Sequence, residues 1–325
     1  MAASPTAAQR ARFAQGLDRL APPGRMLALA VSGGPDSLAL LLLAHAARPG
    51  MIAAATVDHG LRKEAAAEAR MVSDACHRLG VPHWTLPVIV PESPSGVQAA
   101  ARAARYAALA RWGQEVGAIA LATAHHVDDQ AETVLMRLAR GAGLAGLAGV
   151  RPMRALEGGL SLIRPLLGWR RAELGSIVTA AGLKPVDDPS NHDPRFDRTR
   201  ARALLAQGWP EPARLAAVAA HLRDAEEALA WAADREFAHR AELTAGGVVL
   251  DPEGLPMELL LRVVKRALDH VAQAAGEGHP PPLPGPELVR FVARLGAGEH
   301  ATLGLAMASP GPRWTFAVAP PHRTG

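Results

Sequence analysis

The sequence predicts an α/β fold: a doubly wound, mostly parallel sheet with a second, smaller and mainly helical domain. In the first part of the chain, nearly continuous apolar runs alternate with helical ones, which is typical of parallel strands covered on both faces. Around residues 208–212 the pattern changes to an Ala-rich helical segment. We therefore expect two domains, residues 1–208 and residues 209–325.

The individual elements follow from this alternation, beginning with an amphipathic helix over 5–20. Four strands are expected at 25–31, 51–59, 83–90 and 118–126, followed in turn by helices at 36–47, 63–79, 97–115 and 127–140. The glycine-dense stretch 141–150 fits a loop and a compact bend equally well. Next we expect two short strands within 152–167 and a helix within 168–183. A polar loop then runs into an Arg-rich helix over 183–207. The remainder is expected to be mainly helical, with a Pro-rich break at 279–286 and a short β ending.

Composition limits the classes of protein to which the chain can belong. Hydrophobic residues make up 49% of it, and no apolar run approaches the roughly 20 residues of a membrane span, so we expect a folded protein with no membrane segment. The N-terminal segment lacks a signal peptide's apolar centre, so a cytoplasmic location is expected. The single cysteine, Cys76, excludes an internal disulfide and a cysteine-only metal site. Of the 35 basic residues only three are lysine; arginine suits phosphate contacts, but its excess also fits a GC-rich genome.

A small, glycine-bearing loop separates the first expected strand from its helix. Its residues are Ser32, Gly33, Gly34, Pro35, Asp36 and Ser37. Such a turn presents backbone N–H groups and a positive helix end to an anion, which favours phosphate binding. The alternative is a tight turn capped by Ser32 or Ser37. Because a carboxylate beside a polyphosphate needs a cation between them, Asp36 predicts Mg²⁺.

Acidic residues open the helix expected over 127–140. Asp128 and Glu132 are four residues apart, and Asp129 and Glu132 three, so the acids lie on adjoining parts of one helix face. The helix dipole favours acids at this end, so simple capping is the alternative. The preceding strand ends near His125, at the sheet edge where we also expect the loop 32–37. Acids beside a polyphosphate would suit Mg²⁺ or a substrate ammonium.

Several blocks of sequence resemble one known family. The loop 32–37 resembles the Ser-Gly-Gly-x-Asp-Ser signature of the PP-loop ATP pyrophosphatase superfamily. This resemblance implies that the expected sheet has the adenine nucleotide alpha-hydrolase-like fold. The stretch AHHVDDQAETVLMRLARGAGLAGLAGV, residues 124–150, resembles the second signature of the tRNA(Ile)-lysidine synthase family within it. VDHGLR at 57–62, ARAARY at 101–106 and DPSNHDPRFDRTRAR at 188–202 follow that family's order. The resemblance covers residues 25–205.

The resemblance implies an ATP-dependent ligase with Mg²⁺ on Asp36 and ATP on the loop 32–37. Such an enzyme adenylates the wobble cytidine of isoleucine tRNA with a CAU anticodon, joins L-lysine to it to form lysidine, and releases AMP and pyrophosphate. The implied lysine-binding residues are Asp129 and Glu132, assisted by Asp128 and His125. The implied phosphate or tRNA contacts are Arg105, Arg198 and Arg202. Residues 209–325 would contact the tRNA; Trp209 and Trp231 could stack on bases, although sparse tryptophans are more often core residues.

Some features depart from the family pattern or leave alternatives open. Thr199 stands where the family usually has Asn, Gln98 where many members have Glu, and Leu305 in place of a glycine. The rival enzyme is a PP-loop ligase that uses ammonia on a small-molecule carbonyl, of the NAD-synthetase or amidotransferase type. A non-catalytic ATP-binding module is a third reading, but it would not need the acids of residues 128–132. The sequence leaves the oligomeric state open, a homodimer included.

Overall fold

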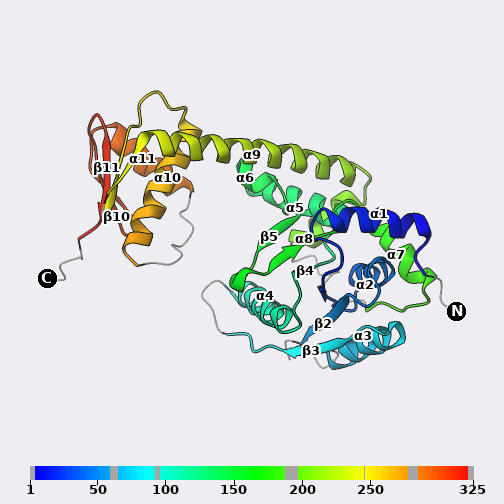
Figure 1. Ribbon diagram of the computed structural model, residues 1–325. Coiled ribbons are helices and arrows are strands. Elements are labelled where there is room, and N and C mark those ends of the chain that lie inside the picture. The colour runs from blue at the N-terminus through cyan, green and yellow to red at the C-terminus, as the bar shows by residue number, and fades with distance from the viewer. Residues whose placement is uncertain are drawn as a thin grey trace. The chain divides into compact units, whose positions relative to one another are not determined.

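The computed structural model describes residues 4–58, 65–91, 96–186, 197–244, 246–276 and 285–320. It divides into two compact units, Met1–Leu222 and Arg223–Gly325 (Figure 1). The division falls inside helix α9 (Pro212–Arg240), whereas the predicted boundary at 208–209 lies just before that helix. The predicted segments 59–62, 188–196 and 279–284 lie outside the described residues.

The first unit is built on a six-stranded sheet with the order β3-β2-β1-β4-β6-β5. Its strands are β1 (Leu27–Ala30), β2 (Ile52–Asp58), β3 (His83–Pro87), β4 (Ala120–Ala122), β5 (Met153–Ala155) and β6 (Ser161–Ile163). All neighbours are parallel except β5, which pairs antiparallel with β6 at the edge. The chain builds outwards from β1 through β2 and β3, then returns to the other side of β1 with β4. The carboxyl ends of β1 and β4 therefore flank the switch point, where such sheets bind ligands.

Helices cover both faces of this sheet. They are α1 (Ala7–Asp18), α2 (Pro35–Ala47), α3 (Ala65–Leu79), α4 (Val97–Glu115), α5 (Val127–Ala139), α6 (Leu144–Leu147), α7 (Arg171–Ala180) and α8 (Asp197–Leu205), with a 3₁₀ turn, η1 (Glu157–Gly159). Side chains alternate along β1: Leu27 and Leu29 join one buried cluster, and Ala28 joins the other. The first cluster contains residues of α1, α2, α3 and α7, and the second contains residues of α4. Figure 1 shows where these helices lie along the sheet.

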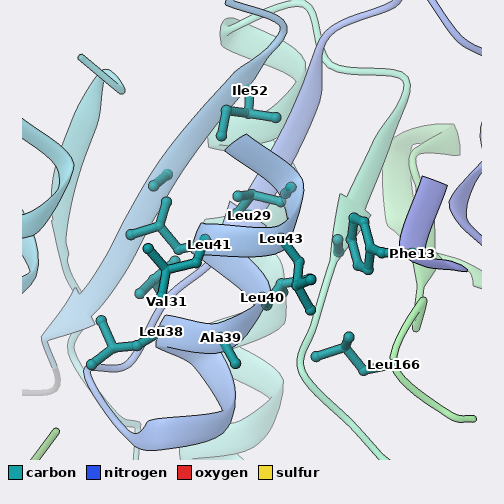
Figure 2. Close-up of a cluster of buried hydrophobic side chains, with 14 of the residues drawn as sticks. Phe13, Leu29, Val31, Leu38, Ala39, Leu40, Leu41, Leu43, Ile52 and Leu166 are labelled. Atoms are coloured by element: carbon teal, nitrogen blue, oxygen red, sulfur yellow. The ribbon is translucent and has the colours of Figure 1, made fainter. Parts of the chain in front are cut away.

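Helix α2 is apolar all round because it is enclosed on all sides. Its residues from Leu38 to Ala44 are buried, with α1 and α7 packed against it. Figure 2 shows Leu40 and Leu43 beside Phe13 of α1, and Leu41 beside Val31 at the end of β1. A helix that is hydrophobic on every side is expected only inside a core. This packing fixes the start of α2, and with it the loop 32–37, against the sheet.

The second unit packs two helices on an antiparallel sheet. Its strands β7 (Ala241–Thr244), β8 (Gly247–Leu250), β9 (Ala301–Leu303), β10 (Ala306–Ser309) and β11 (Trp314–Val318) are ordered β7-β8-β11-β10-β9. Helices α10 (Met257–Ala274) and α11 (Gly285–Gly296) contribute Val263 and Phe291 to a core that includes Phe316 of β11. The predicted β ending is thus part of a larger sheet, because the hairpin β7–β8 joins it. No helix among the described residues has both the length and the apolar content to cross a membrane.

Candidate active site

The loop 32–37 leaves the first turn of α2 open to a ligand. Gly34 occupies the N-cap position, and no side chain caps the helix. Ser37 Oγ instead donates to the Gly34 carbonyl at 2.9 Å and accepts from the Ser32 amide at 3.2 Å. Neither serine therefore caps the helix, although Ser37 does close the turn, as the alternative interpretation expects. Uncapped N–H groups at a helix start form an anion site.

Gly33 allows this loop to bend tightly against its neighbours. Its φ of +86° lies in the left-handed region, and a Cβ there would come within 3.1 Å of Met71 and 3.3 Å of Val72 and Val186. The Val186 amide also donates to the Gly33 carbonyl at 3.0 Å. Any larger residue at position 33 would both strain the backbone and push the loop away from its support. The glycine thus fixes the position of the loop.

His126 joins the beginnings of α2 and α5. It is the N-cap of α5: its amide donates to Asp129 Oδ2 at 3.0 Å, and its Nδ1 lies 3.4 Å from the Asp129 amide nitrogen and 3.6 Å from Asp128 Oδ2. Its Nε2 lies 3.3 Å from Asp36 Oδ2, at the start of α2. The side chain is completely buried. His126 therefore connects the loop 32–37 with the acids of α5 across the switch point.

The carboxylates around His126 favour its charged form. Burial alone would lower the pKa of His126, but hydrogen bonds to Asp128 and Asp36 and the charge of Asp129 outweigh it and raise the pKa to about 9. The pKa of Asp129 is lowered, because the charges of His126 and Arg198 outweigh the effect of its burial. An imidazolium held among three carboxylates offsets negative charge that would otherwise repel a polyphosphate.

His125, the residue just before His126, has a lowered pKa, whereas that of His126 is raised. Burial lowers its pKa to about 4, with Asp129 acting in the other direction. Its Nδ1 lies 3.0 Å from Thr123 Oγ1. His125 is therefore neutral near pH 7 and can exchange hydrogen bonds with a ligand, but it is a weaker base than free imidazole.

The arginines of α8 face the acids of α5. Arg198 Nε donates to Glu132 Oε2 at 2.6 Å, and Arg202 Nε to Glu132 Oε1 at 3.0 Å. Arg198 also pairs with Asp129. Helix α8 packs against α5, so both arginines reach these acids, while Leu204 of the same helix is exposed. Their positive charges are thus largely committed to carboxylates.

Glu132 and Asp128 lie away from the open cavity. The side chain of Glu132 is 1% exposed, behind Arg198, Arg202 and Arg171. Asp128 Oδ2 accepts the amide of Arg171, the first residue of α7, at 2.8 Å. Of the three acids of α5, only Asp129 lines the cavity. Asp128 therefore serves as a cap for the neighbouring helix.

A cavity of about 660 Å³ opens where these elements meet. Its walls include the loop residues Ser32, Gly34, Pro35, Asp36 and Ser37, together with Thr56, Arg102, Arg105, Tyr106, His125, Asp129, Arg171, Arg198 and Arg202. This volume is typical of small-molecule and cofactor sites. The predicted site residues thus come together around one cavity, with Gly33, Asp128 and Glu132 supporting it from behind.

Asp36 has an oxygen available for a cation. Its Oδ1 is buried and has no hydrogen-bond partner, while Oδ2 faces His126. Within the described part of the chain, no group of three or more His, Cys, Asp or Glu side chains is arranged to hold a metal ion. A single carboxylate is nevertheless what Mg²⁺ commonly takes from a protein, because substrate phosphates and water complete its shell.

Sequence reasoning missed some residues of this site and misjudged others. No role was expected for His126, which stands just before the acidic helix and is its N-cap. Arg171 gave no signal, because nothing local shows that α7 packs beside α5. The interpretation of Trp209 and Trp231 as core residues is wrong, since they are 81% and 62% exposed.

Known proteins resemble this chain over nearly its whole length. Residues 6–208 match the PP-loop domain family. A tRNA(Ile)-lysidine synthase from Novosphingobium aromaticivorans is 47% identical over 317 residues, covering 96% of this chain and 94% of that protein. One from Zymomonas mobilis is 44% identical, covering 93% and 91%.

Among solved structures, the fold is similar to that of the U34-tRNA thiolase NcsA from Methanococcus maripaludis. The TM-score is 0.55 at 18% identity, and the match covers 66% of this chain and 77% of that one. The structural likeness supports the fold alone, whereas the sequence identities support the family. The chain belongs to the tRNA(Ile)-lysidine synthase family, and its PP-loop domain is the sheet and phosphate loop described above.

Proposed function

We propose that this enzyme joins L-lysine to the wobble cytidine of isoleucine tRNA with a CAU anticodon, using ATP and releasing AMP and pyrophosphate. The observation that carries the proposal is the meeting of the uncapped start of α2 with Asp129 and His125 around one cavity. The family membership supplies the substrates. With a tRNA substrate, we expect the reaction to take place in the cytoplasm.

The loop 32–37 would bind the phosphates of ATP. The first N–H groups of α2 would donate to a phosphate there, and the positive helix end would favour its charge. Mg²⁺, held by Asp36, would supply charge neutralisation on the pyrophosphate as it leaves. The imidazolium of His126 behind Asp36 fixes the orientation of that carboxylate.

The first step forms a bond between O2 of the cytosine and the α-phosphorus of ATP and breaks the bond from that phosphorus to the bridging oxygen. Negative charge develops on the phosphates, so donors placed at the loop and at Arg105, on the cavity wall, would stabilise it. The adenylate makes O2 a leaving group. We propose that Arg198 and Arg202 contact phosphate through N–H groups that their carboxylate partners leave available.

The second step replaces AMP by the side-chain amine of lysine. The lysine ammonium would bind Asp129 on the cavity wall, and Glu132 by exchange with one of its arginines. The amine must then lose a proton before it attacks C2. The lowered pKa of His125 makes it a weak base, so we assign it a hydrogen-bonding role that orients the amine or the base.

The second unit is proposed to contact the tRNA. Trp231 is 62% exposed, and the guanidinium of Arg235 lies over its ring at 5.0 Å. An exposed aromatic ring beside an arginine is a common platform for unpaired bases.

The proposal is tested by measuring AMP release with each substrate withheld in turn. AMP should form only when tRNA is present, and the lysine-modified tRNA only when lysine is added. Ammonium in place of lysine should give no product on tRNA. If AMP forms with ammonium and a small carbonyl compound but not with tRNA, the ammonia-dependent alternative holds instead.

A further inference from the structure

A group of arginines surrounds Tyr106, the only tyrosine of the chain. The guanidinium of Arg102, on α4, lies 5.1 Å from the ring centroid, and that of Arg154, on β5, lies 4.9 Å from it. Arg164 directly follows β6, and its pKa is lowered by burial and by the charges of Arg154 and Arg102, with Tyr106 acting in the opposite direction. We call Arg102, Tyr106, Arg154 and Arg164 the arginine–tyrosine cluster.

No aspartate or glutamate among the described residues neutralises the positive charge of this cluster. Across the described residues, Arg102, Arg154 and Arg164 form no ion pair with an aspartate or glutamate, in contrast to Arg198 and Arg202 of α8. Three like charges in close proximity repel one another, and contact with one aromatic ring offsets only about 0.5–1 kcal/mol for each exposed cation. An arrangement of this kind is expected where an anion binds.

Arg164 provides a second, independent observation. Its side chain is buried, with the residue 4% exposed, yet its Nε has no hydrogen-bond partner. Its Nη1 donates to the Arg151 carbonyl. A buried donor left without an acceptor costs about 1–3 kcal/mol, and such groups are rare in folded proteins. The missing acceptor is therefore expected on a ligand.

The cluster begins on the cavity wall and extends away from the loop 32–37. Arg102 and Tyr106 line the same cavity as the loop 32–37, but Arg154 lies on the edge strand β5. The order β1-β4-β6-β5 places that strand three spacings from β1, which is roughly 14 Å. The cluster thus extends from the cavity wall to the rim of the sheet, where a macromolecule would enter.

We propose that the arginine–tyrosine cluster binds a phosphodiester of the tRNA anticodon loop beside the reacting cytidine, an inference that rests on the proposed function. Guanidinium groups bind phosphate through paired, charge-assisted hydrogen bonds, and Arg is favoured over Lys for this purpose. Contacts to phosphate set the position of a nucleic acid without reading its sequence. The cluster would therefore hold the loop so that its wobble base enters the cavity.

The test compares Arg102→Ala, Arg154→Ala and the double variant with the wild type. Both side chains are exposed, so the variants should fold normally. The affinity for an isoleucine tRNA transcript is measured over a range of salt concentrations. Each lost phosphate contact should make the plot of log affinity against log salt less steep by about 0.7. The variant should then gain roughly fivefold less affinity than the wild type when salt is lowered from about 1 M to about 0.1 M.

Arg111→Ala is the matched control, because Arg111 is exposed on the same helix and forms no ion pair or side-chain hydrogen bond with any residue that the structure describes. It should leave the slope at the wild-type value. ATP affinity, measured without RNA, should be unchanged in all four variants. A double variant with the wild-type slope overturns the proposal, as does one that loses ATP affinity but keeps tRNA affinity, because the cluster would then serve ATP. Lysidine formation by the wild type is measured separately. A wild type that forms no lysidine contradicts the proposed function, whereas an unchanged salt slope in the double variant contradicts only the role of the arginine–tyrosine cluster.

Discussion

Replacing Glu132 by glutamine removes one negative charge and keeps the size of the side chain. Glu132 is 1% exposed and accepts hydrogen bonds from Arg198 at 2.6 Å, Arg202 at 3.0 Å and Arg171 at 3.4 Å. The amide oxygen of glutamine can keep one of these bonds. Its NH₂ group faces a second guanidinium, which it cannot accept from. The substitution therefore weakens both of the short contacts.

The expected loss of unfolding free energy follows from these contacts. A hydrogen bond to a charged group contributes about 1.5–3 kcal/mol and a neutral one about 1 kcal/mol, so two weakened bonds cost roughly 2 kcal/mol. The loss should stay below the 3–5 kcal/mol typical of a broken buried pair, because the side chains of Arg198 and Arg202 are 47% and 31% exposed and can be rehydrated. For a unit of this size, about 2 kcal/mol lowers Tm by roughly 4–8 °C.

The assay combines chemical denaturation with steady-state kinetics. Glu132→Gln should lower the free energy of unfolding by about 2 kcal/mol and raise the KM for lysine, while ATP affinity stays unchanged. Glu299→Gln is the control, because its pair with Arg294 is more than half exposed on both sides and should contribute less than about 1 kcal/mol. A Glu132→Gln enzyme with wild-type stability and wild-type lysine KM would refute the reasoning.

Four further substitutions test other parts of the site. Asp36→Ala should abolish AMP formation and leave the circular dichroism spectrum unchanged, because the residue opens a helix beside the cavity; AMP release near the wild-type rate would contradict this. His126→Asn should cost stability in a pH-dependent way. The pKa of His126 is raised from 6.5 to about 9 in the folded protein, so its charge contributes fully below pH 6.5 and the contribution is lost as pH rises through 9. The difference in unfolding free energy between the two proteins should therefore shrink, by up to about 3 kcal/mol, between pH 6 and pH 9.5, and a constant difference would show that the ring is neutral. Asp129→Asn should raise the lysine KM, whereas Asp128→Asn should lower Tm with little effect on lysine, because Asp128 accepts the Arg171 amide; equal effects of both on lysine KM would be incompatible with this assignment.

Much of the fold of the first unit is predictable because its signals are local. The apolar runs of β1 and β2 and the helix over 97–115 lie close to the predicted positions. The hairpin β7–β8 is not predictable in this way, because its strands have only four residues each. Its stability comes from the pairing of β8 with β11, which is far away in the sequence. The antiparallel direction of β5 is likewise set by tertiary pairing.

The candidate site is predictable only in part, for a similar reason. The loop 32–37 and Asp129 could be expected to meet, because both follow strands at the carboxyl edge of a parallel sheet. The contact of Arg198 with Glu132 could not be expected, because it depends on how α8 packs against α5. His126 was hidden by its type, because histidine is an uncommon N-cap and its buried contact with Asp36 joins residues ninety positions apart.

The most direct test of the central claim is the nucleoside composition of the tRNA after reaction. An isoleucine tRNA transcript with a CAU anticodon is incubated with the enzyme, ATP, Mg²⁺ and lysine, then digested and analysed by mass spectrometry. The account predicts that the wobble cytidine gains one lysine less one water, only when ATP and lysine are both present, and that the Asp36→Ala enzyme leaves it unmodified. An unmodified wobble cytidine after incubation with active wild-type enzyme would contradict the account.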